Sequence, residues 1–341
     1  MFRCDGTPQT GLGHSSRSLA LAEAFIDRGY QCLFVGDFDP FVQNRLRGAE
    51  IAWENIDPTS WTSEDAGVLG QIARRVHAIG VVVDSYVVGS DYLALVERNG
   101  APILLIDDFA ALSHYPCSAV LNFTSRAPEF TYPCDRIRCY LGPTWFLARR
   151  SLRHIRAHGP RSTENARHVL VTSGGNDPID VVVPAVEALL ACDDSLSVRA
   201  VVRPNYDALN HLEALLSRFS GETSILTRLQ DLTPELASAD LCIANAGLTK
   251  YEAAYIGVPT GVLSQNDGQV KDAVKFAQLG MTIDLGAASD IDSARLTMQV
   301  SRLLTDREGR GKMQQECFVN FPLDPTARLV DAVLTDVFSG S

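Results

Sequence analysis

Short apolar runs alternate with longer helical patterns along most of the chain, and this alternation limits the fold more than any other feature. Runs such as 80–85 and 102–108 have the length and β-branched content of buried strands. A strand, a helix and another strand in succession form a parallel sheet whose helices cover its faces. In the first half we therefore expect strands at 2–5, 31–36, 80–85, 102–108 and 119–123 and helices at 14–28, 64–79 and 90–99.

The same alternation starts again after an interruption near the middle of the chain. Residues 144–166 are basic and polar and contain Gly159-Pro160, as expected of a linker. The 341 residues exceed one typical domain, so we predict an α/β protein with two Rossmann-like, doubly wound domains that face each other across a cleft. The expected parts are an N-terminal domain (1–148), a linker (149–166), a C-terminal domain (167–320) with strands at 168–172, 198–203, 224–227, 241–244, 260–264 and 282–285, and a terminal helix within 321–341 that packs back on the first domain.

Composition argues against several classes of partner. The formal net charge of −11 and the lack of a Lys/Arg run disfavour nucleic acids and anionic membranes. The apolar runs are far shorter than a membrane span of about 20 residues, and no apolar signal core follows Met1. The eight cysteines form no CxxC pair, so we expect reduced thiols, a cytoplasmic protein and no zinc site. The first strand is either short or begins upstream of Met1, and the oligomeric state stays open.

The loop that follows the first expected strand carries the motif GLGHSSR. Ligands of open parallel sheets bind beyond the carboxyl ends of strands, where such loops lie. Gly11 and Gly13 permit a tight or left-handed turn, and Ser15 or Ser16 could cap the following helix. His14 would then stand at the positive end of the helix dipole, which favours neutral imidazole and keeps a nitrogen available as a general base. The alternative is a histidine that only caps or packs.

A second glycine-containing loop, VTSGGNDP, opens the second half. The strand before it runs into Gly174, Gly175 and Asn176, whose backbone N–H groups could receive a phosphate or a sugar hydroxyl. Asp177 is a plausible N-cap and Pro178 suits the first position of a helix. A tight turn without a ligand is the alternative.

The stretch ANAGLTKYEAAYIGVP is the most informative one. Its strand enters Asn245 and Gly247, and a short helix starts near Leu248 and ends at the glycine of IGVP. The turn and the helix N-terminus, with Thr249, would form a cradle for a diphosphate. Glu252 lies one turn into this helix, where its two oxygens could accept hydrogen bonds from both ribose hydroxyls.

Acidic residues end two further strands of the first half. VVDSY places Asp84 and Tyr86 at a strand end, and LIDDF does the same for Asp107 and Asp108. Clustered carboxylates could orient a water molecule or bind a divalent metal. Because no octahedral ligand set is evident, we predict neither a metal nor another cofactor. At least one of these aspartates is expected to serve only as a cap or a buried acceptor.

These motifs together resemble a known family. FRCD, TGLGHSSR, DSY, LLIDDF, VLNF, YLGPTWFLARR, VLVTSGGNDP and ANAGLTKYEAAYIGVP look like the nucleotide-sugar hydrolases of pseudaminic acid biosynthesis, which release UDP from UDP-2,4-diacetamido-2,4,6-trideoxy-β-L-altropyranose. Those hydrolases are similar to GT-B glycosyltransferases, including the enzyme that forms lipid II, whose nucleotide site has the glycine turn and ribose-binding glutamate found here as Gly247 and Glu252. The resemblance implies that His14 activates water and that Tyr86 lies in the sugar pocket.

One position departs from that family. The hydrolases commonly have Asn-Gln where this chain has Gly268-Gln269. An amide contact to the sugar is therefore either absent or supplied by Asn266, which with Gln269 can lie at the mouth of the next strand-to-helix connection.

The predicted function is hydrolysis of a UDP-sugar by attack of water at C1 with inversion. The alternatives are an inverting GT-B glycosyltransferase that uses a soluble acceptor and a nucleotide-sugar-binding protein without catalysis. The candidate catalytic residues are His14, Asp84 and Asp108. The candidate substrate-binding residues are Gly13, Arg17, Tyr86, Asp107, Gly174, Gly175, Asn176, Asn245, Gly247, Leu248, Thr249, Glu252, Asn266 and Gln269.

Overall fold

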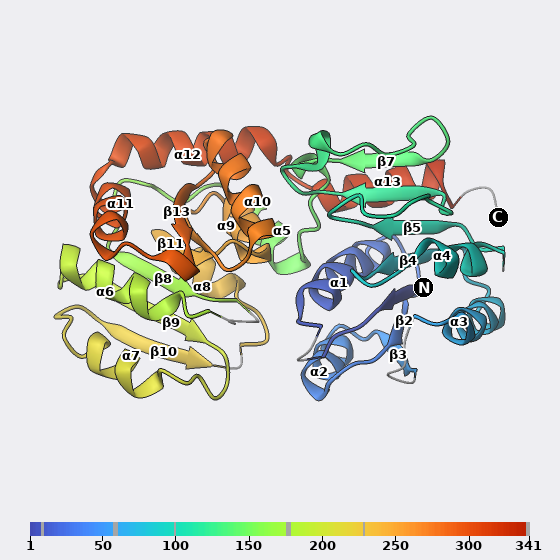
Figure 1. Cartoon of the computed structure of the whole chain (residues 1–341), viewed down its shortest axis with the longest axis horizontal. Helices are drawn as coiled ribbons and strands as arrows, with labels where there is room; N and C mark the ends of the chain where they lie inside the picture. Colours follow the sequence, from blue (N-terminus) through green and yellow to red (C-terminus); the bar gives the residue numbers. More distant parts are fainter. Residues whose placement is uncertain (8–9, 57–60, 99, 175–178, 228, 339–341) are drawn as a thin grey trace. The chain divides into compact units, whose positions relative to one another are not determined.

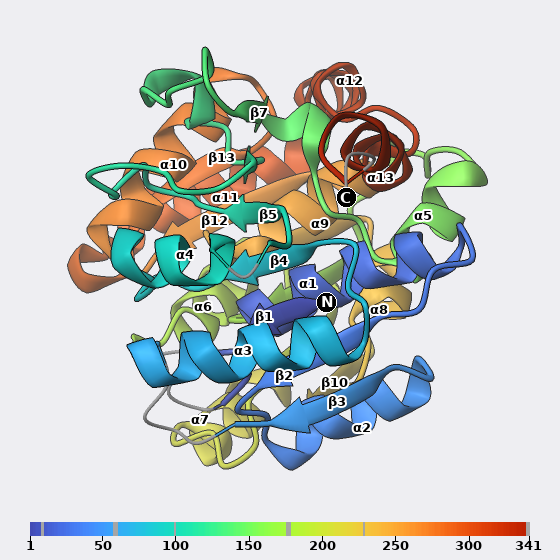
Figure 2. The ribbon, with the colours of Figure 1, turned by 90° about the vertical axis from the view of Figure 1, so that its right-hand side faces the viewer.

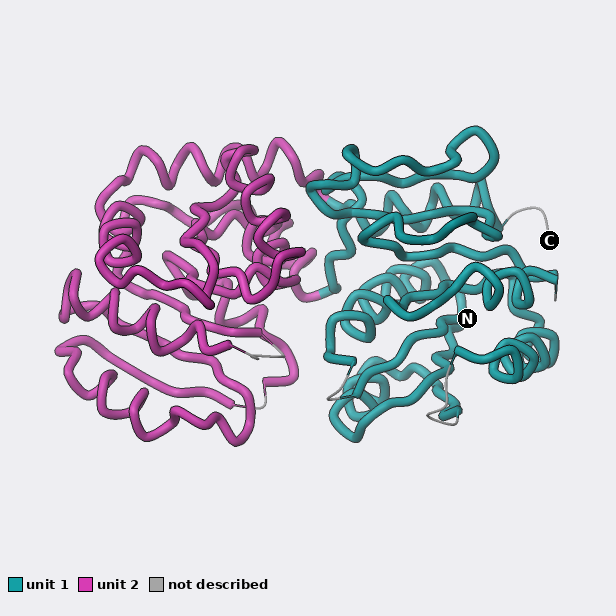
Figure 3. Tube along the Cα trace, viewed as in Figure 1, with its two compact units in different colours: residues 1–150, 324–341 teal, residues 151–323 magenta. Residues whose placement is uncertain are grey.

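Parallel sheets organise both halves of the computed structural model (Figure 1). The structure describes residues 1–7, 10–56, 61–98, 100–174, 179–227 and 229–338. The chain divides into two compact units, which are residues 1–150 with 324–341 (unit 1) and residues 151–323 (unit 2) (Figure 3). The predicted α/β class with two Rossmann-like, doubly wound sheets is confirmed.

Unit 1 contains a seven-stranded sheet in the order β3-β2-β1-β4-β5-β6-β7. The chain winds outward from β1 in one direction and from β4 in the other, so the switch point lies between these two strands. The strands are β1 (Phe2–Cys4), β2 (Leu33–Gly36), β3 (Ala52–Asn55), β4 (Val81–Asp84), β5 (Ile103–Ile106), β6 (Ala119–Asn122) and β7 (Arg138–Leu141). The helices are α1 (Gly13–Ile26), α2 (Pro40–Gly48), α3 (Ser63–Arg75), α4 (Ser90–Glu97) and α13 (Pro325–Asp336), with short 3-10 turns η1 (Ala127–Glu129) and η2 (Pro143–Trp145).

Unit 2 repeats this winding with six strands in the order β10-β9-β8-β11-β12-β13. Its strands are β8 (His168–Thr172), β9 (Ser197–Val202), β10 (Thr223–Thr227), β11 (Leu241–Asn245), β12 (Thr260–Ser264) and β13 (Ile283–Ala287). Its helices are α6 (Val182–Cys192), α7 (Leu209–Leu216), α8 (Thr233–Ser238), α9 (Leu248–Ile256), α10 (Asp267–Gln278), α11 (Ser293–Thr305) and α12 (Arg307–Asn320), with η3 (Ala288–Asp290). α5 (Arg150–Ala157) begins at the boundary between the units.

Side chains of β1 show how the central strands of unit 1 are held from both faces. Phe2 stacks on Phe34 with ring centroids 5.0 Å apart and meets Phe25 of α1 edge-on at 6.2 Å. Successive side chains of a strand point to opposite faces, so Arg3 lies on the other face, where it donates to Asp65 of α3 at 2.8 Å. α3 and α4 lie side by side over that face (Figure 2).

The end of the chain packs onto unit 1. Arg28 of α1 binds both carboxylate oxygens of Asp331 in α13, at 2.8 and 2.9 Å. Phe338 stacks near Phe25 with ring centroids 6.2 Å apart, and it covers Gly80 just before β4. The Arg28–Asp331 ion pair therefore joins α1 to α13, and the Phe25–Phe338 contact joins α1 to the residues that follow α13.

Several local features differ from the expectations. The segment 149–166, expected as a linker, contains α5 and the boundary between the units. The strands β3 and β7 were not predicted because each lies at a sheet edge with partly exposed residues. Neither Ser15 nor Ser16 caps α1, since both lie inside its first turn and Leu12 occupies the N-cap position. In the second half, α6 begins only at Val182, whose N–H donates to Asp180 at 2.9 Å, while Asp177 and Pro178 lie outside the described residues.

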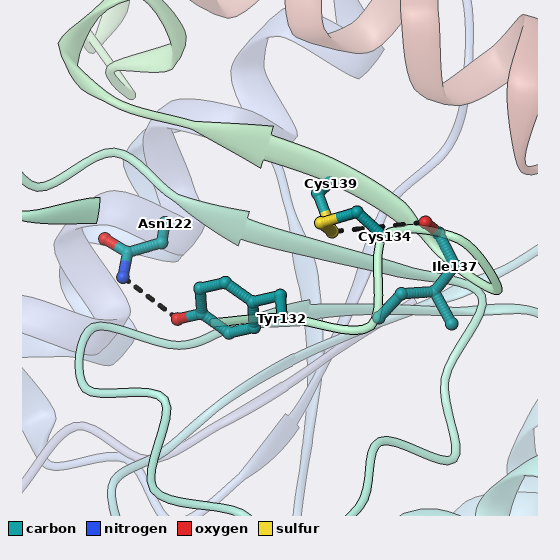
Figure 4. The surroundings of a disulfide bond; sticks show 5 residues. All are labelled: Asn122, Tyr132, Cys134, Ile137 and Cys139. Atoms are coloured by element: carbon teal, nitrogen blue, oxygen red, sulfur yellow. Dashed lines mark hydrogen bonds between the residues drawn. A yellow bond between two sulfur atoms is a disulfide. The ribbon is translucent and has the colours of Figure 1, made fainter. Parts of the chain in front are cut away.

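The expectation of eight free thiols was also wrong. Cys134, in the connection between β6 and β7, forms a disulfide with Cys139 of β7 (Figure 4). Tyr132 of the same connection accepts a hydrogen bond from Asn122 at 3.0 Å and donates one to the Asp107 carbonyl at 3.1 Å. The other six cysteines are unpaired. Among the described residues, no helix has the length and apolar character needed to span a membrane.

Gly80 offers a test of the packing under α13. A Cβ atom added at Gly80 would lie 2.3 Å from the Phe338 ring. We expect Gly80→Ala to lower the free energy of unfolding of unit 1 by about 1–3 kcal/mol through overpacking, measured by urea denaturation. Gly67→Ala is the matched control, because a Cβ there meets nothing within 4 Å and alanine favours a helix interior by about 0.5–1 kcal/mol. Equal stability of the Gly80 variant and the wild type would contradict this packing.

Candidate functional site

A buried carboxylate at the end of β4 organises the candidate site of unit 1. Asp84 is fully buried. One of its oxygens lies 2.6 Å from His14 Nδ1 and accepts from Arg17 Nη2 at 2.7 Å. The other accepts from Arg17 Nε at 2.7 Å and from the Ser18 hydroxyl at 3.3 Å. Four donors therefore surround a single carboxylate.

Arg17 connects this carboxylate to a second one at the end of β5. Its Nη1 donates to Asp108 Oδ2 at 2.7 Å, and the Tyr86 hydroxyl donates to the same oxygen at 2.7 Å. The Tyr86 ring meets the His14 imidazole edge-on, with centroids 4.3 Å apart. The structure thus brings together five predicted site residues, which we call the His14 cluster: His14, Arg17, Asp84, Tyr86 and Asp108.

Charges in the His14 cluster fix the ionisation states of its members. Burial alone would raise the pKa of Asp84, but the charges and hydrogen bonds of Arg17 and His14 hold it well below its ordinary value. The Tyr86 residue is 60% exposed, but desolvation of its hydroxyl and the adjacent Asp108 carboxylate raise the pKa of the phenol. Asp84 is therefore an anion and Tyr86 a neutral hydroxyl near pH 7.

The ionised Asp84 also sets the tautomer of His14. A carboxylate can only accept hydrogen bonds, so Nδ1 of His14 must carry the proton shared over 2.6 Å. In the neutral imidazole Nε2 then holds the lone pair, and Nε2 makes no hydrogen bond to any described residue. A carboxylate that orients an imidazole in this way leaves the distal nitrogen ready to take a proton.

The remaining predicted residues of unit 1 have other roles. Asp107 accepts from the backbone of Phe109 and Ala110 at 3.0 and 3.2 Å and from the Tyr115 hydroxyl at 3.0 Å, so it shapes the loop after β5. The Asp107 side chain is half-buried, and these three contacts all lie within the loop after β5. Gly11 has a left-handed φ of 76°, whereas Gly13 is simply the first residue of α1.

The loop after β11 forms the second candidate site, in unit 2. The helix predicted from Leu248 is confirmed, and α9 ends at Gly257 in the left-handed conformation. Asn245 is buried and donates to Gln265 Oε1 at 3.1 Å, while the Gly247 N–H makes a long hydrogen bond of 3.4 Å to Asn245 Oδ1. Thr249 and Glu252 are also buried on α9.

Two neighbouring loops were predicted to contribute as well. A Cβ atom at Gly174, after β8, would lie 3.3 Å from Asn245 Oδ1 and 3.6 Å from the Thr249 hydroxyl, so this turn adjoins the β11 loop. Gly175 and Asn176 fall outside the described residues. Asn266 and Gln269 cap α10, because Asn266 accepts from the Gln269 N–H at 3.0 Å and Gln269 Oε1 accepts from the Gln265 N–H at 2.9 Å.

Sequence reasoning missed the polar side chains that support the β11 loop. Lys250 is almost fully buried, and its Nζ lies 2.6 Å from Asp272 of α10. The Gln265 side chain donates to the Ile179 carbonyl at 2.9 Å and so ties the loop after β8 to β12. A lysine inside the apolar face of a short helix was the available signal for the first of these.

Metal binding is not supported by any cluster in the described part of the chain. No group of three or more His, Cys, Asp or Glu side chains there is placed to hold an ion. Asp84 and Asp108, considered above as ligands, are instead bridged by the guanidinium of Arg17.

The fold defines the class: two Rossmann-like sheets of this kind constitute the GT-B fold. It is shared with MurG of Acinetobacter baumannii (16% identity, 98% of each chain, TM-score 0.64) and with a UDP-glucosyltransferase of Polygonum tinctorium (15% identity, 100% of this chain and 98% of that one, TM-score 0.71). A putative UDP-N-acetylglucosamine 2-epimerase of Listeria monocytogenes also superimposes, with a TM-score of 0.63 at 12% identity over 98% of this chain and 94% of that one.

Comparison of sequences finds relatives of higher identity, whereas no protein-family model matches the chain. The spore coat polysaccharide biosynthesis protein SpsG of Bacillus subtilis is 25% identical over 314 residues, which cover 88% of this chain and 87% of SpsG. An uncharacterized protein of Methanocaldococcus jannaschii is 22% identical over 273 residues, 78% of this chain but only 55% of that protein.

Removal of the Asp84 charge should destabilise unit 1 in a pH-dependent manner. We expect Asp84→Asn to lower the free energy of unfolding at pH 7 by about 3–5 kcal/mol, because the buried Arg17 loses its ion pair with Asp84 and keeps the one with Asp108. Since the folded pKa of Asp84 is depressed, the wild-type contribution is complete above about pH 4, the ordinary Asp pKa, and is lost as the pH falls through the folded pKa. Urea denaturation from pH 7 downward should show the difference shrinking only below about pH 4.

The exposed Asp135 provides the matched control for this measurement. Its side chain is 78% exposed, so Asp135→Asn should change the free energy of unfolding by less than about 0.5 kcal/mol. A similarly small effect at Asp84 would contradict the ion pair.

Proposed function

We propose that the protein hydrolyses a UDP-sugar, with the nucleotide held by the β11 loop of unit 2 and water activated by His14 of unit 1. The observation that carries the proposal is the buried His14–Asp84 pair, which leaves Nε2 of an oriented imidazole available as a base. The GT-B fold supports it, because the proteins named above that share this fold include a UDP-glucosyltransferase.

The chemistry is a single displacement at the anomeric carbon. A lone pair of water forms a bond to C1 while the bond from C1 to the phosphate oxygen breaks, which inverts the configuration. The proton of water passes to His14 Nε2, and the bonding electrons leave with UDP. The anion of Asp84 stabilises the resulting imidazolium, in the manner of an oriented His–Asp pair.

UDP needs little protonation to depart. The second pKa of a phosphate is about 6, so the diphosphate is already a good leaving group near neutral pH. Backbone N–H groups of the turn at Gly247 and of the first turn of α9 would receive its developing charge, as helix N-termini do for phosphates. The buried Glu252 would accept from the ribose hydroxyls.

We further propose that the sugar is an amino or deoxy sugar destined for a nonulosonic acid or a related surface glycan. Two observations support this: the motif resemblance to the pseudaminic acid hydrolases and the similarity to SpsG, whose name places it in spore coat polysaccharide biosynthesis. Tyr86, held beside His14 by Asp108, would contact the sugar.

Glycosyl transfer is the second candidate function. It is favoured by the glycosyltransferases among the proteins that share the fold. In this reaction His14 Nε2 would take the proton of an acceptor hydroxyl instead of water, with the same bonds formed and broken at C1.

A panel of UDP-sugars distinguishes these functions. With water as the only acceptor, hydrolysis predicts stoichiometric release of UDP and free sugar from one member of the panel, with inversion observed by NMR at early times. UDP release that requires an added acceptor would support transfer and contradict hydrolysis. Binding without turnover under either condition would contradict both.

His14 should control turnover but not nucleotide binding. We expect His14→Gln to lower kcat by about 10²–10⁴-fold, the usual contribution of a positioned base, while the Kd of UDP measured by calorimetry stays unchanged. His211→Gln is the control, because the side chain of His211 is 56% exposed and lies outside the His14 cluster. Wild-type turnover in the His14 variant would exclude its role as the base.

A further inference from the structure

Lys250 is a buried charged residue of unit 2 that the proposed reaction does not use directly. This α9 residue is only 1% exposed. Its Nζ donates to the carbonyl oxygen of Ala246 at 2.5 Å and lies 3.4 Å from that of Gly247. It also pairs with Asp272 at 2.6 Å. The ammonium therefore touches the backbone of the β11 loop from its buried side.

The side chains of Tyr251, Asp272 and Phe276 hold Lys250 in this position. The Tyr251 hydroxyl lies 3.0 and 2.8 Å from the two oxygens of Asp272. The ammonium lies 4.5 Å from the Tyr251 ring centroid and 5.7 Å from that of Phe276. Such a buried ion pair is weak evidence of added stability, because well-packed apolar residues often serve as well or better. A more specific effect of this ion pair is that it fixes the orientation of the β11 loop backbone.

Because each peptide unit is planar, the position of Lys250 determines where the N–H groups of the β11 loop point. A trans peptide places C=O and the following N–H on opposite sides of the bond. When Lys250 holds the Ala246 and Gly247 carbonyls toward the interior, the N–H groups of Gly247 and Leu248 are directed away from it. The first N–H groups of a helix also lack acceptors within that helix.

Two further observations fit a ligand at these donors. Among the residues that the structure describes, the Gly247 N–H has only a long hydrogen bond of 3.4 Å to Asn245, which a phosphate oxygen could replace with a shorter one. Ser173 follows β8 beside Gly174, and its buried hydroxyl has no hydrogen-bond partner among the described residues. A buried hydroxyl normally has a partner, and a bound ligand would supply it.

We propose that Lys250 is a positioning residue that sets the backbone N–H groups of the β11 loop for the diphosphate, and that Asp272 keeps it there. This inference rests on the proposed function, since it assumes that unit 2 binds UDP. Lys250 acts through the loop, because its ammonium is already engaged by two carbonyl oxygens and a carboxylate.

The diphosphate dependence of binding tests this role. Calorimetry with UDP and with uridine, which lacks phosphates, compares Lys250→Met with the wild type. We expect the affinity for UDP to fall about tenfold or more, equivalent to one lost charge-assisted hydrogen bond, while the affinity for uridine stays the same. Glu252→Gln should instead weaken both ligands, because both contain the ribose.

Matched variants separate positioning from charge and from folding. Lys271→Met removes the same charge from an exposed place on α10, and it should leave both affinities unchanged. Asp272→Asn keeps Lys250 but weakens the ion pair that holds it, so this variant should lower the affinity for UDP and leave the affinity for uridine unchanged. It tests the positioning role if Lys250→Met does not fold. Equal losses for uridine and UDP, or no loss for UDP, would overturn the inference while leaving the proposed function intact. A wild type that binds neither ligand would overturn both.

Discussion

The need to stabilise the buried charge of Asp84 determines the candidate site of unit 1. β4 follows β1 in the sheet at the switch point of the winding, so the helix that leaves β1 starts beside the end of β4. His14, Arg17 and Ser18 occupy positions i, i+3 and i+4 of that helix, which share one face. All three consequently reach the same carboxylate. An oriented imidazole is thus a consequence of how the chain neutralises one aspartate.

The two units share the same winding of the chain but differ in the groups that they offer at the strand ends. In unit 1, the carboxylate of Asp84 at the end of β4 holds the imidazole of His14, which lies in the first turn of α1. In unit 2, the β11 loop offers backbone donors, and the charged side chains Lys250 and Asp272 stand behind the loop instead of within it. An oriented imidazole suits the removal of a proton, and backbone N–H donors suit the binding of an anion. The proposed roles of the two units therefore follow from which groups line their strand ends.

Hydrophobic periodicity was sufficient to predict the architecture, because the central strands of both sheets are buried on both faces and appear as apolar runs. It failed at the sheet edges, where β3 and β7 have mixed residues. The sequence also placed His14, Asp84 and Asp108 at strand or helix ends. It did not predict that the Arg17 guanidinium bridges Asp84 and Asp108, because this contact depends on how closely three separate elements pack. Asn266 and Gln269 cap α10, a role that the sequence did not predict, and their contact with the sugar stays a prediction. Lys250 was overlooked because a lysine on a helix is ordinarily solvated.

The packing of α13 on α1 also means that the two units can complete their folding at different times during synthesis. Unit 1 consists of residues from both ends of the chain, whereas unit 2 is continuous. During synthesis from the N-terminus, all of unit 2 is made before Phe338 becomes available to cover Gly80 and Phe25. Unit 2 can therefore fold while unit 1 still exposes an apolar surface, and the catalytic half of the proposed enzyme is completed last.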